Sequence, residues 1–575
     1  MTQSIRHALI CKLFSWCFTG IKMLLSQPFP TTSNPAAPEP SSLLAPAIRQ
    51  PPLPTNTGWL NFILKEGSAP EYIHPYLVQC KDGALSISYP SRVVDANFIY
   101  QAFVPDLTIR SNSLDGGKHV VSSFDDLSVT VEFPGGMVVP LVRGCPYITL
   151  IFDEAASLQL STIHAVIEVS TFESSTKHKV TFNNGQTWLI YSSDAVNISS
   201  NLVVNQDFKG VVRVALLTGN EATEEVLDSF SSAYPLQGHA DISCPFEIKY
   251  KWKKGGWGEL LMLSLPLHRE LMSYPSPDNV QTAVTYRSMD GDMHAVIGDS
   301  WTLNEIPICV GWYSTKGLTD QCCRDIIASA LKNDVAALTK ITTDSSYFYG
   351  KAVARAARLA LIAEEISTFD DIGDILNFLV DTITPWLEGT FGANAFLYDE
   401  KWGGLTTQNG SVNSGADFGF GVYNDHHYHL GYFCYAGAVL AKLDPTWGMK
   451  YRSHLYTLVN DYMTPYHPHI QYSKHLSYMQ RDPFHPRGTE VAYSKAFFPR
   501  YRNFDFWVLH SWAGGLTEFL DGRNQESTSE AVNAYYSASL LGQAFGDDQL
   551  MDTGLTLAAF EMHSARHCGM FHQIA

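Results

Sequence analysis

The hydrophobic pattern of the chain changes period once, near residue 318. Between about residues 59 and 300, apolar and polar residues alternate in short runs such as 127–133 and 178–191, and an Asn-Asn-Gly turn at 183–185 interrupts the second run. Alternation at period two with Asn-Gly turns is typical of antiparallel strands and hairpins. The pattern therefore predicts an all-β region at residues 55–300, which we expect to be a large sandwich.

After residue 318 the apolar residues recur at spacings of three and four, which is typical of amphipathic helices. The predicted helices are 320–338, 346–366, 372–387, 430–443, 451–462, 527–545 and 549–564. Strands come first and helices follow without βαβ alternation, which argues against a Rossmann fold or a TIM barrel. We expect a connecting region at 301–345 and an all-α domain at 346–575.

Composition and charge narrow the class of protein. Of the 575 residues 45% are hydrophobic, 12% aromatic and only 17% charged, which is typical of a globular chain and not of a disordered one. Asp and Glu number 57 against 39 Lys and Arg, a net charge of −18 that repels phosphate backbones, so we expect no nucleic-acid partner. The ten cysteines include no CxxC pair, which argues against a zinc ribbon or a thioredoxin-type site.

The first 54 residues differ in character from the rest. An apolar stretch at 13–21 is closed off by Lys12 and Lys22, far short of the roughly 20 residues that a membrane helix needs. It is either a weak signal peptide or a leader of no consequence, so an extracellular or cell-wall location and a cytoplasmic one both stay open. Nine prolines fall between residues 28 and 54, and we expect residues 1–54 to be a disordered leader and linker. No later segment reaches transmembrane length.

A first polar cluster precedes the helix predicted at 430–443. It places Asp425 beside three histidines, with glycines and aromatic residues around them. Asn424 or Asp425 would cap the helix in the plain structural interpretation. A metal site would need ligands from other elements, because on a helix His427 points away from the face that Asp425 and His429 share. We therefore expect no metal, and the remaining use of the cluster is to orient an acid and to bind a polyol.

A second cluster, at 521–536, runs from a loop into a helix. The Ser527-x-x-Glu530 spacing fits a capping box, in which both side chains serve the backbone. In the functional interpretation Glu526 and Glu530, four residues apart, face one cleft, and the positive end of the helix keeps a carboxylate ionised. An ionised carboxylate is what a general base requires.

Both clusters together contain what glycoside hydrolysis needs. One carboxylic acid protonates the leaving oxygen, a second carboxylate activates water or attacks, and aromatic faces stack against sugar rings. The aromatic residues in or near the clusters are Trp402, Tyr423, Tyr428, Trp507, Trp512, Tyr535 and Tyr536. Each of these would fit equally well in a core.

Several separated segments of the chain resemble glycoside hydrolase family 81, the endo-β-1,3-glucanases of fungi, bacteria and plants. The motifs are YNDHHYHLGY at 423–432, HSWAGG at 510–515 and DGRNQESTSEAVN at 521–533. The segments PLPTN at 52–56, EYIHPY at 71–76 and YDEKWGG at 398–404 are also similar to family segments. The resemblance runs from about residue 52 to about residue 564.

The resemblance implies an N-terminal β-sandwich, a small α/β connecting domain and a C-terminal (α/α)6 toroid. It also implies inverting hydrolysis of internal β-1,3-glucosidic bonds in β-glucans, without a metal or another cofactor. Asp425 would be the general acid, and the base would come from the pair Glu526 and Glu530. The residues expected to bind the glucan are Trp402, Tyr423, Asn424, His427, His429, His510, Trp512, Asn524, Asn533 and Tyr536. For a plant member, the resemblance implies a role in defence against pathogens.

Two departures from the family pattern leave alternatives open. Residues 464–502 carry six basic against two acidic residues without strand or helix periodicity, which indicates an insertion. The helical pattern also breaks after residue 563, and seven or eight helices after residue 346 fall short of twelve, so we expect an incomplete toroid and a truncated C-terminus. The alternatives are a non-catalytic β-glucan-binding protein that recognises elicitors, and a fragment that does not fold stably.

Overall fold

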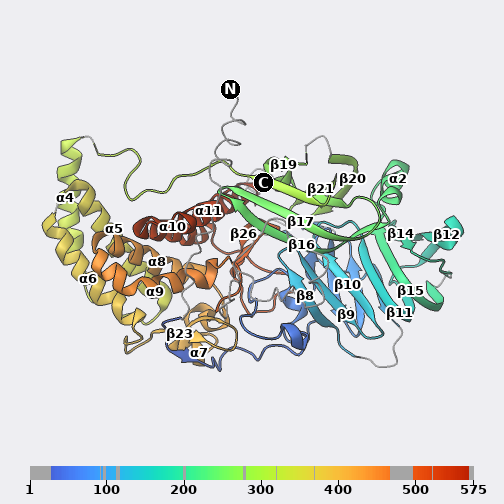
Figure 1. Cartoon of the computed structure of the whole chain (residues 1–575), viewed down its shortest axis with the longest axis horizontal. Helices are drawn as coiled ribbons and strands as arrows, with labels where there is room; N and C mark the ends of the chain where they lie inside the picture. Colours follow the sequence, from blue (N-terminus) through green and yellow to red (C-terminus); the bar gives the residue numbers. More distant parts are fainter. Residues whose placement is uncertain are drawn as a thin grey trace, which may run out of the picture.

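A computed structural model describes residues 27–90, 92–94, 99–111, 117–198, 202–275, 280–318, 320–367, 369–465, 497–520 and 522–568. The first half of the chain is built of strands and the second half mainly of helices, and the two regions lie side by side (Figure 1). The predicted order of strands followed by helices is thereby confirmed. The predicted leader up to residue 26 and most of the predicted insertion lie outside the described residues. The predicted break of the helical pattern after residue 563 is wrong as far as the chain is described, because the last helix continues to Cys568.

The largest sheet has 12 strands, and every pairing in it is antiparallel. Its main path is β12-β13-β14-β15-β11-β7-β4-β3-β2, while β10 pairs with β11 and β9, and β8 pairs with β9. The strands are β2 (Glu71–Ile73), β3 (Tyr76–Lys81), β4 (Ala84–Ser88), β7 (Leu107–Ser111), β8 (Val120–Asp125), β9 (Ser128–Phe133), β10 (Met137–Val142), β11 (Ile148–Ser161), β12 (Val166–Phe172), β13 (Lys177–Phe182), β14 (Thr187–Ser192) and β15 (Val203–Leu216). A separate hairpin joins β5 (Arg92–Val94) and β6 (Ile99–Gln101).

Two smaller sheets accompany the large one. The first has the order β16 (Ala233–Cys244), β17 (Glu247–Gly256), β22 (Ser300–Asn304) and β19 (Met272–Tyr274), and the second β18 (Leu261–Ser264), β21 (Gly291–Ile297) and β20 (Val280–Ser288). Two short helices, α2 (Glu221–Ser229) and α3 (Pro266–Leu271), connect strands of this region. Buried aromatic rings join the sheets: Tyr76 of the large sheet stacks on Trp188 at 5.8 Å and meets Tyr286 of β20 edge-on at 6.2 Å. The alternation predicted for residues 127–133 appears in β9, where Val129, Val131 and Phe133 are buried.

Seven long helices follow in the described part of the chain, and each matches a predicted one. They are α4 (Gln321–Ala336), α5 (Ser346–Ile366), α6 (Phe369–Leu387), α8 (His426–Leu443), α9 (Pro445–Met463), α10 (Thr528–Phe545) and α11 (Asp548–Cys568). Helix α8 is buried along nearly its whole length because α5, α6, α9 and α10 all pack against it. It begins at His426, four residues before the predicted start, so that Asp425 occupies its N-cap position. Within the described residues, no helix combines the length and the apolar character needed to cross a membrane.

The prediction of a disordered linker needs correction for residues 27–54. Strand β1 (Thr31–Thr32) pairs in parallel with β23 (Phe396–Asp399), which forms a hairpin with β24 (Gly404–Thr407). Leu44 and Leu53 are fully buried. The segment is rich in proline yet ordered because its leucines enter the core and its few backbone donors find partners, such as the Leu53 N–H that donates to Trp402 O at 2.9 Å.

The predicted insertion at 464–502 includes residues at its end that are part of the packed core. Tyr501 N–H donates to the carbonyl oxygen of Thr464 at 2.9 Å, so the two ends of the segment meet. Phe498, Tyr501 and Arg502 are buried, because their side chains complete the core next to α9 and the β-rich region. Residues 497–502 therefore belong to the packed structure, and residues 466–496 lie outside the described part.

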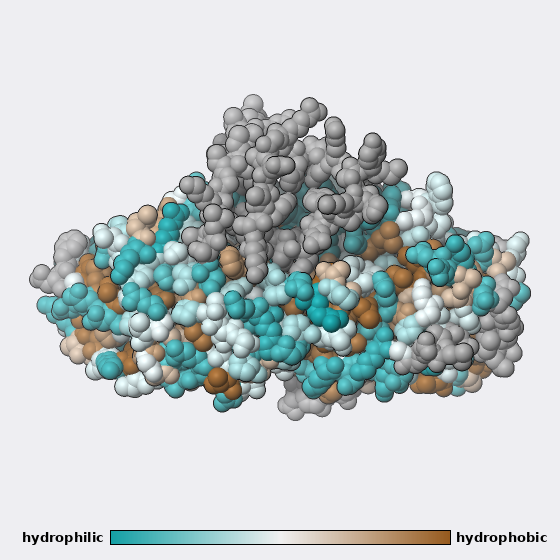
Figure 2. Space-filling view, turned by 60° about the horizontal axis from the view of Figure 1, so that its bottom comes forward, coloured by the Kyte–Doolittle hydropathy of each residue, from teal (hydrophilic) through white to brown (hydrophobic). Residues whose placement is uncertain are grey.

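One face of the molecule carries hydrophilic side chains over both the β-rich and the helical halves, with hydrophobic residues interspersed among them (Figure 2).

The short helix α7 (Gln408–Val412) and the 3-10 turns of η5 (Ala416–Val422) lead the chain from β24 to the start of α8. This connection carries the first of the two polar clusters.

Candidate active site

Asp425 lies at a strained turn immediately before α8. Tyr423 has φ 70° and Asp425 has φ 59°, left-handed conformations that cost about 1–3 kcal/mol each for non-glycine residues. Asn56 of the N-terminal segment offsets part of this conformational cost, because its side-chain amide donates to Tyr423 O at 3.1 Å and to Gly514 O at 3.0 Å. The Asp425 N–H donates to Ala513 O at 2.9 Å. The turn thus joins the first polar cluster to the loop that carries the second.

The Asp425 carboxylate does not cap its helix. Within the described residues it makes no capping hydrogen bond, although its backbone carbonyl accepts from Tyr428 N–H and His429 N–H and starts α8. Burial raises the pKa of Asp425 to about 7, and the charges of Glu526 and Glu530 add to the effect. The structural interpretation of Asp425 as a cap is therefore wrong, and its side chain is a carboxyl group with a raised proton affinity.

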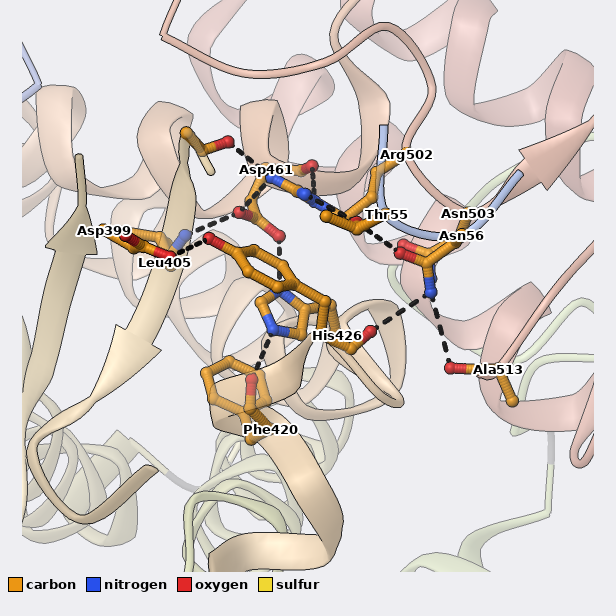
Figure 3. Close-up of polar contacts among 12 residues, drawn as sticks. Thr55, Asn56, Asp399, Leu405, Phe420, His426, Asp461, Arg502, Asn503 and Ala513 are labelled. Atoms are coloured by element: carbon orange, nitrogen blue, oxygen red, sulfur yellow. Dashed lines mark hydrogen bonds and ion pairs between the residues drawn. The ribbon is translucent and has the colours of Figure 1, made fainter. Parts of the chain in front are cut away.

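A buried polar network holds the start of α8 in place (Figure 3). His426 Nδ1 lies 2.7 Å from Asp461 Oδ2, and Arg502 lies 3.1 Å from the other oxygen of Asp461. Burial alone would raise the pKa of Asp461, but the charges of Arg502 and His426 lower it. Arg502 also donates to Thr55 Oγ1 at 2.9 Å and to Gly403 O at 2.8 Å. The network connects α8, α9, β24 and the N-terminal segment behind the candidate site.

Glu530 lies in the first turn of α10 and binds tyrosines from two other helices. Its Oε1 accepts hydrogen bonds from Tyr347 of α5 at 2.8 Å and from Tyr432 of α8 at 2.7 Å. Ser527 occupies the N-cap position but makes no capping hydrogen bond to the backbone, so the predicted capping box does not form. Burial would raise the pKa of Glu530, but hydrogen bonds from Tyr432, Tyr347 and Ser527 lower it below its ordinary value.

Glu526 precedes this helix and is exposed. Its charge is the largest electrostatic influence on Asp425, followed by that of Glu530. The structure therefore brings all three predicted carboxylates into one electrostatic neighbourhood. Their environments differ: burial favours the neutral form of Asp425, whereas hydroxyl donors favour the charged form of Glu530.

Asn424 and Asn524 organise the loop between the two clusters. Asn424 Oδ1 accepts from Gly515 N–H at 2.8 Å and from Thr517 Oγ1 at 3.1 Å. Asn524 Oδ1 accepts from Gly514 N–H at 3.0 Å. These amides were predicted to bind the glucan, which stays a prediction, and in the structure their side-chain oxygens accept hydrogen bonds that shape the loop. Asp521 lies outside the described residues.

Several residues predicted to contact the glucan are buried. Trp402 and Tyr423 are 1% and 0% exposed, with the Trp402 indole donating to Pro38 O at 2.8 Å and the Tyr423 hydroxyl donating to Asp399 at 2.7 Å. His427 and His429 are also buried. Burial, together with the nearby His426 and His429 rings, holds the pKa of His427 well below its usual range. These four predictions need correction, because the side chains support the turn from within.

The remaining predicted contact residues lie around the clusters. Trp512 is half-buried, donates to Asp505 at 2.7 Å and meets the His510 ring edge-on at 4.5 Å. Tyr536 is half-buried and donates to Gly311 O at 2.6 Å. Asn533 of α10 is half-buried, and within the described residues its amide nitrogen has no hydrogen-bond partner.

The structure adds aromatic residues that the sequence analysis missed. Tyr347, Phe348 and Phe418 form a cluster with ring centroids 5.2–5.9 Å apart, next to Glu530. Phe348 is 53% and Phe418 55% exposed, unusual for large apolar side chains. Tyr432, the last residue of the motif at 423–432, was not predicted to act at the site. The run of three aromatic residues at 347–349, at the start of a predicted helix, was the sequence feature that could have indicated this aromatic cluster.

A cavity of about 470 Å³ lies elsewhere, and its lining residues do not include the three carboxylates. It is lined from both halves of the chain, by Trp59, Asp126 and Arg143 of the β-rich part and by Arg500 and Asp505. Arg143 and Asp505 form a buried ion pair of 2.6 Å there. The cavity is therefore a feature of the junction between the two regions, separate from the carboxylates.

Comparison with known proteins assigns the class. Residues 38–315 match the glycosyl hydrolase family 81 N-terminal domain, and residues 318–573 match the glycosyl hydrolase family 81 C-terminal domain. The chain belongs to glycoside hydrolase family 81. The resemblance seen in the motifs is confirmed.

Relatives from several kingdoms support this assignment. A glucan endo-1,3-β-D-glucosidase of Glycine max is 46% identical over 549 residues, covering 94% of this chain and 78% of that protein. A glucan endo-1,3-β-D-glucosidase of Arthroderma benhamiae is 24% identical, over 88% of this chain but only 59% of that protein. The solved structure of a mutant family 81 glycoside hydrolase from Clostridium thermocellum shares the fold with a TM-score of 0.75 at 19% identity, covering 94% of this chain and 74% of that one.

Proposed function

We propose that this protein hydrolyses internal β-1,3-glucosidic bonds of β-glucans with inversion of configuration. The observation that carries the proposal is the pair of carboxylates, Asp425 and Glu530, whose surroundings shift their pKa values in opposite directions. Such a divergence is typical of an acid and a base that work on one bond. The soybean relative, 46% identical, is named for hydrolysis of 1,3-β-glucan.

Asp425 suits the role of general acid. With its pKa raised to about 7, it holds a proton at mildly acidic pH and can give it to the glycosidic oxygen. Within the described residues no capping hydrogen bond engages the carboxyl group, so it remains available to a ligand. The buried His426–Asp461–Arg502 network fixes the backbone from which it projects.

Glu530 is the better candidate for the base of the two glutamates. Tyr347 and Tyr432 both donate to its Oε1, which fixes the orientation of the carboxylate. Its lowered pKa keeps it ionised at the pH where Asp425 is protonated. Glu526 is exposed and acts in this account through its charge, which raises the pKa of Asp425.

The exposed rings of Phe348 and Phe418 provide a surface for glucose rings. Both lie next to Tyr347, which binds Glu530, so a sugar stacked on them would be near the proposed base. Stacking on aromatic faces is a common way to bind the apolar face of a ligand ring. The half-buried Trp512 and Tyr536 are candidates for further contacts.

The finer architecture is part of the proposal. We infer that the large sheet and the smaller sheets that pack against it form a sandwich, because strands β8, β9 and β10 pack against β16. Helices α5, α6, α8, α9, α10 and α11 would be members of an (α/α)6 toroid, supported by the packing of α5, α6, α9 and α10 against α8 and of α11 against α10.

The test is the release of reducing ends from a linear β-1,3-glucan, followed together with viscosity. An endo-acting enzyme lowers the viscosity early, when few ends have been released. Asp425→Asn and Glu530→Gln should each reduce the rate by about 100-fold or more, whereas Glu518→Gln, which alters a carboxylate paired with Lys65, should not. Retention of the glucan without any release by the folded protein would instead favour a binding protein.

A further inference from the structure

Two histidines and a glutamate converge at the C-terminal helix, outside the candidate active site. His567 Nε2 lies 2.7 Å from Glu270 Oε2, and His563 Nε2 lies 3.8 Å from the same oxygen. The three ligand atoms all lie within 4.8 Å of one another. His563 and His567 are four residues apart on α11 and share one face of the helix. Glu270 comes from α3, which packs against α11.

A second carboxylate lies next to the His563 ring. Its Nδ1 lies 2.6 Å from Glu305 Oε2, and the side chain of Glu305 is only 7% exposed. A carboxylate beside one ring nitrogen favours the tautomer that carries the proton there and leaves the lone pair on the other nitrogen, an arrangement that is usual for histidines that bind metals. Among the described residues, the buried Nε2 of His563 has no hydrogen-bond partner. That free nitrogen faces the point where Glu270 and His567 meet.

The chemistry of the ligands selects the kind of ion. Two imidazole nitrogens and one carboxylate oxygen suit Zn²⁺ and similar transition metals, whereas Ca²⁺ and Mg²⁺ prefer oxygen ligands throughout. We propose that Glu270, His563 and His567 bind one divalent transition-metal ion such as Zn²⁺, with water completing a four-coordinate site. The ion would join α11 to α3, and thereby the helical region to the β-rich region.

A second group of one histidine and two carboxylates in the described part of the chain differs from the group at α11, because an arginine already pairs with one of its carboxylates. Asp125, Asp126 and His239 also converge, but the Arg500 guanidinium binds Asp126 and supplies a positive charge there. In the group at α11, the Oε2 atom that both contacts share belongs to Glu270, and within the described residues it is paired with the two histidines. A metal ion is therefore proposed for the α11 group alone, and the hydrolytic mechanism needs none.

The proposal is tested by titrating Zn²⁺ into the full chain after treatment with a chelator, using isothermal calorimetry near pH 7.5. We expect one high-affinity ion per chain, with His567→Ala and Glu270→Gln each weakening the binding by about 100-fold or more. Glu305→Gln, which only loosens the His563 ring, should weaken it by about 10- to 100-fold. His294→Ala removes an imidazole outside the group and should leave the affinity unchanged.

Two further readouts separate a built site from loose binding to surface histidines. Co²⁺ bound at the site should give the intense visible bands of a four-coordinate ion, and Zn²⁺ should raise the unfolding temperature of the parent chain but not that of Glu270→Gln. Glu270 is largely exposed, so that variant should fold like the parent, which circular dichroism would verify. Zn²⁺ affinities equal in the parent, His567→Ala and Glu270→Gln would overturn the proposal, as would the absence of binding.

Discussion

Tyr432 donates a hydrogen bond of 2.7 Å to Glu530, so the helix that begins after Asp425 also holds the carboxylate of α10. The acid and the base of the proposed mechanism are therefore positioned by the same helix, α8. Any shift of α8 would change the proton affinity of one carboxylate and the orientation of the other.

Removing the Tyr432 hydroxyl should alter the pH dependence of the enzyme. Hydrogen bonds from Tyr432 and Tyr347 lower the pKa of Glu530, so Tyr432→Phe should raise it and move the acidic limb of the kcat/KM profile to higher pH. A hydrogen bond to a charged group contributes about 1.5–3 kcal/mol, so kcat should fall about 10-fold or more. Tyr435→Phe is the matched control on the same helix, because that hydroxyl interacts with Arg358 instead. An unchanged acidic limb in Tyr432→Phe would contradict the assignment of Glu530.

The basic limb should report Asp425. Activity should fall as the pH rises through about 7, where Asp425 loses its proton. Because the charge of Glu526 raises that pKa, Glu526→Gln should move the basic limb to lower pH. The measurement is the kcat/KM profile on a soluble β-1,3-glucan, with Glu518→Gln as a control carboxylate in the same loop. A basic limb that stays in place would show that Glu526 does not act through Asp425.

Neutralising Asp425 should stabilise the fold at alkaline pH. Its folded pKa of about 7 exceeds the ordinary value of 3.8, so the folded state holds a proton that the unfolded state releases, and stability declines as the pH rises between these values. Asp425→Asn removes the free-energy cost of ionising this buried carboxyl group in the folded state. We expect the gain in free energy of unfolding to be about 2–3 kcal/mol larger at pH 8 than at pH 5, by denaturant titration. A gain independent of pH would contradict the raised pKa.

The buried network behind the turn should be a major source of stability. Asp461→Asn leaves the fully buried Arg502 without its counter-charge, which costs about 3–5 kcal/mol. Asp334→Asn breaks the exposed pair with Arg355, at 3.4 Å, and should cost less than about 1 kcal/mol. Thermal unfolding of the two variants compares the losses directly. Equal losses would show that the network is not what holds the turn.

Periodicity predicted the helices and the β-rich region because both depend on local spacing. The start of α8 was predicted four residues late, since polar residues 424–429 hide a helix whose first turn is buried. The pairing of Tyr347 with Glu530 joins residues 183 positions apart and leaves no local pattern. For the same reason the burial of Trp402 and Tyr423 and the order of residues 27–54 depend on packing that only the folded chain reveals.

The most direct test of the central claim is proton NMR of the reducing ends released from a linear β-1,3-glucan in the first minutes of reaction. If Asp425 protonates the leaving oxygen while Glu530 activates water on the opposite face, the α-anomer must appear first and the β-anomer must follow by mutarotation. Initial release of the β-anomer, or release undiminished in Glu530→Gln, would contradict the account.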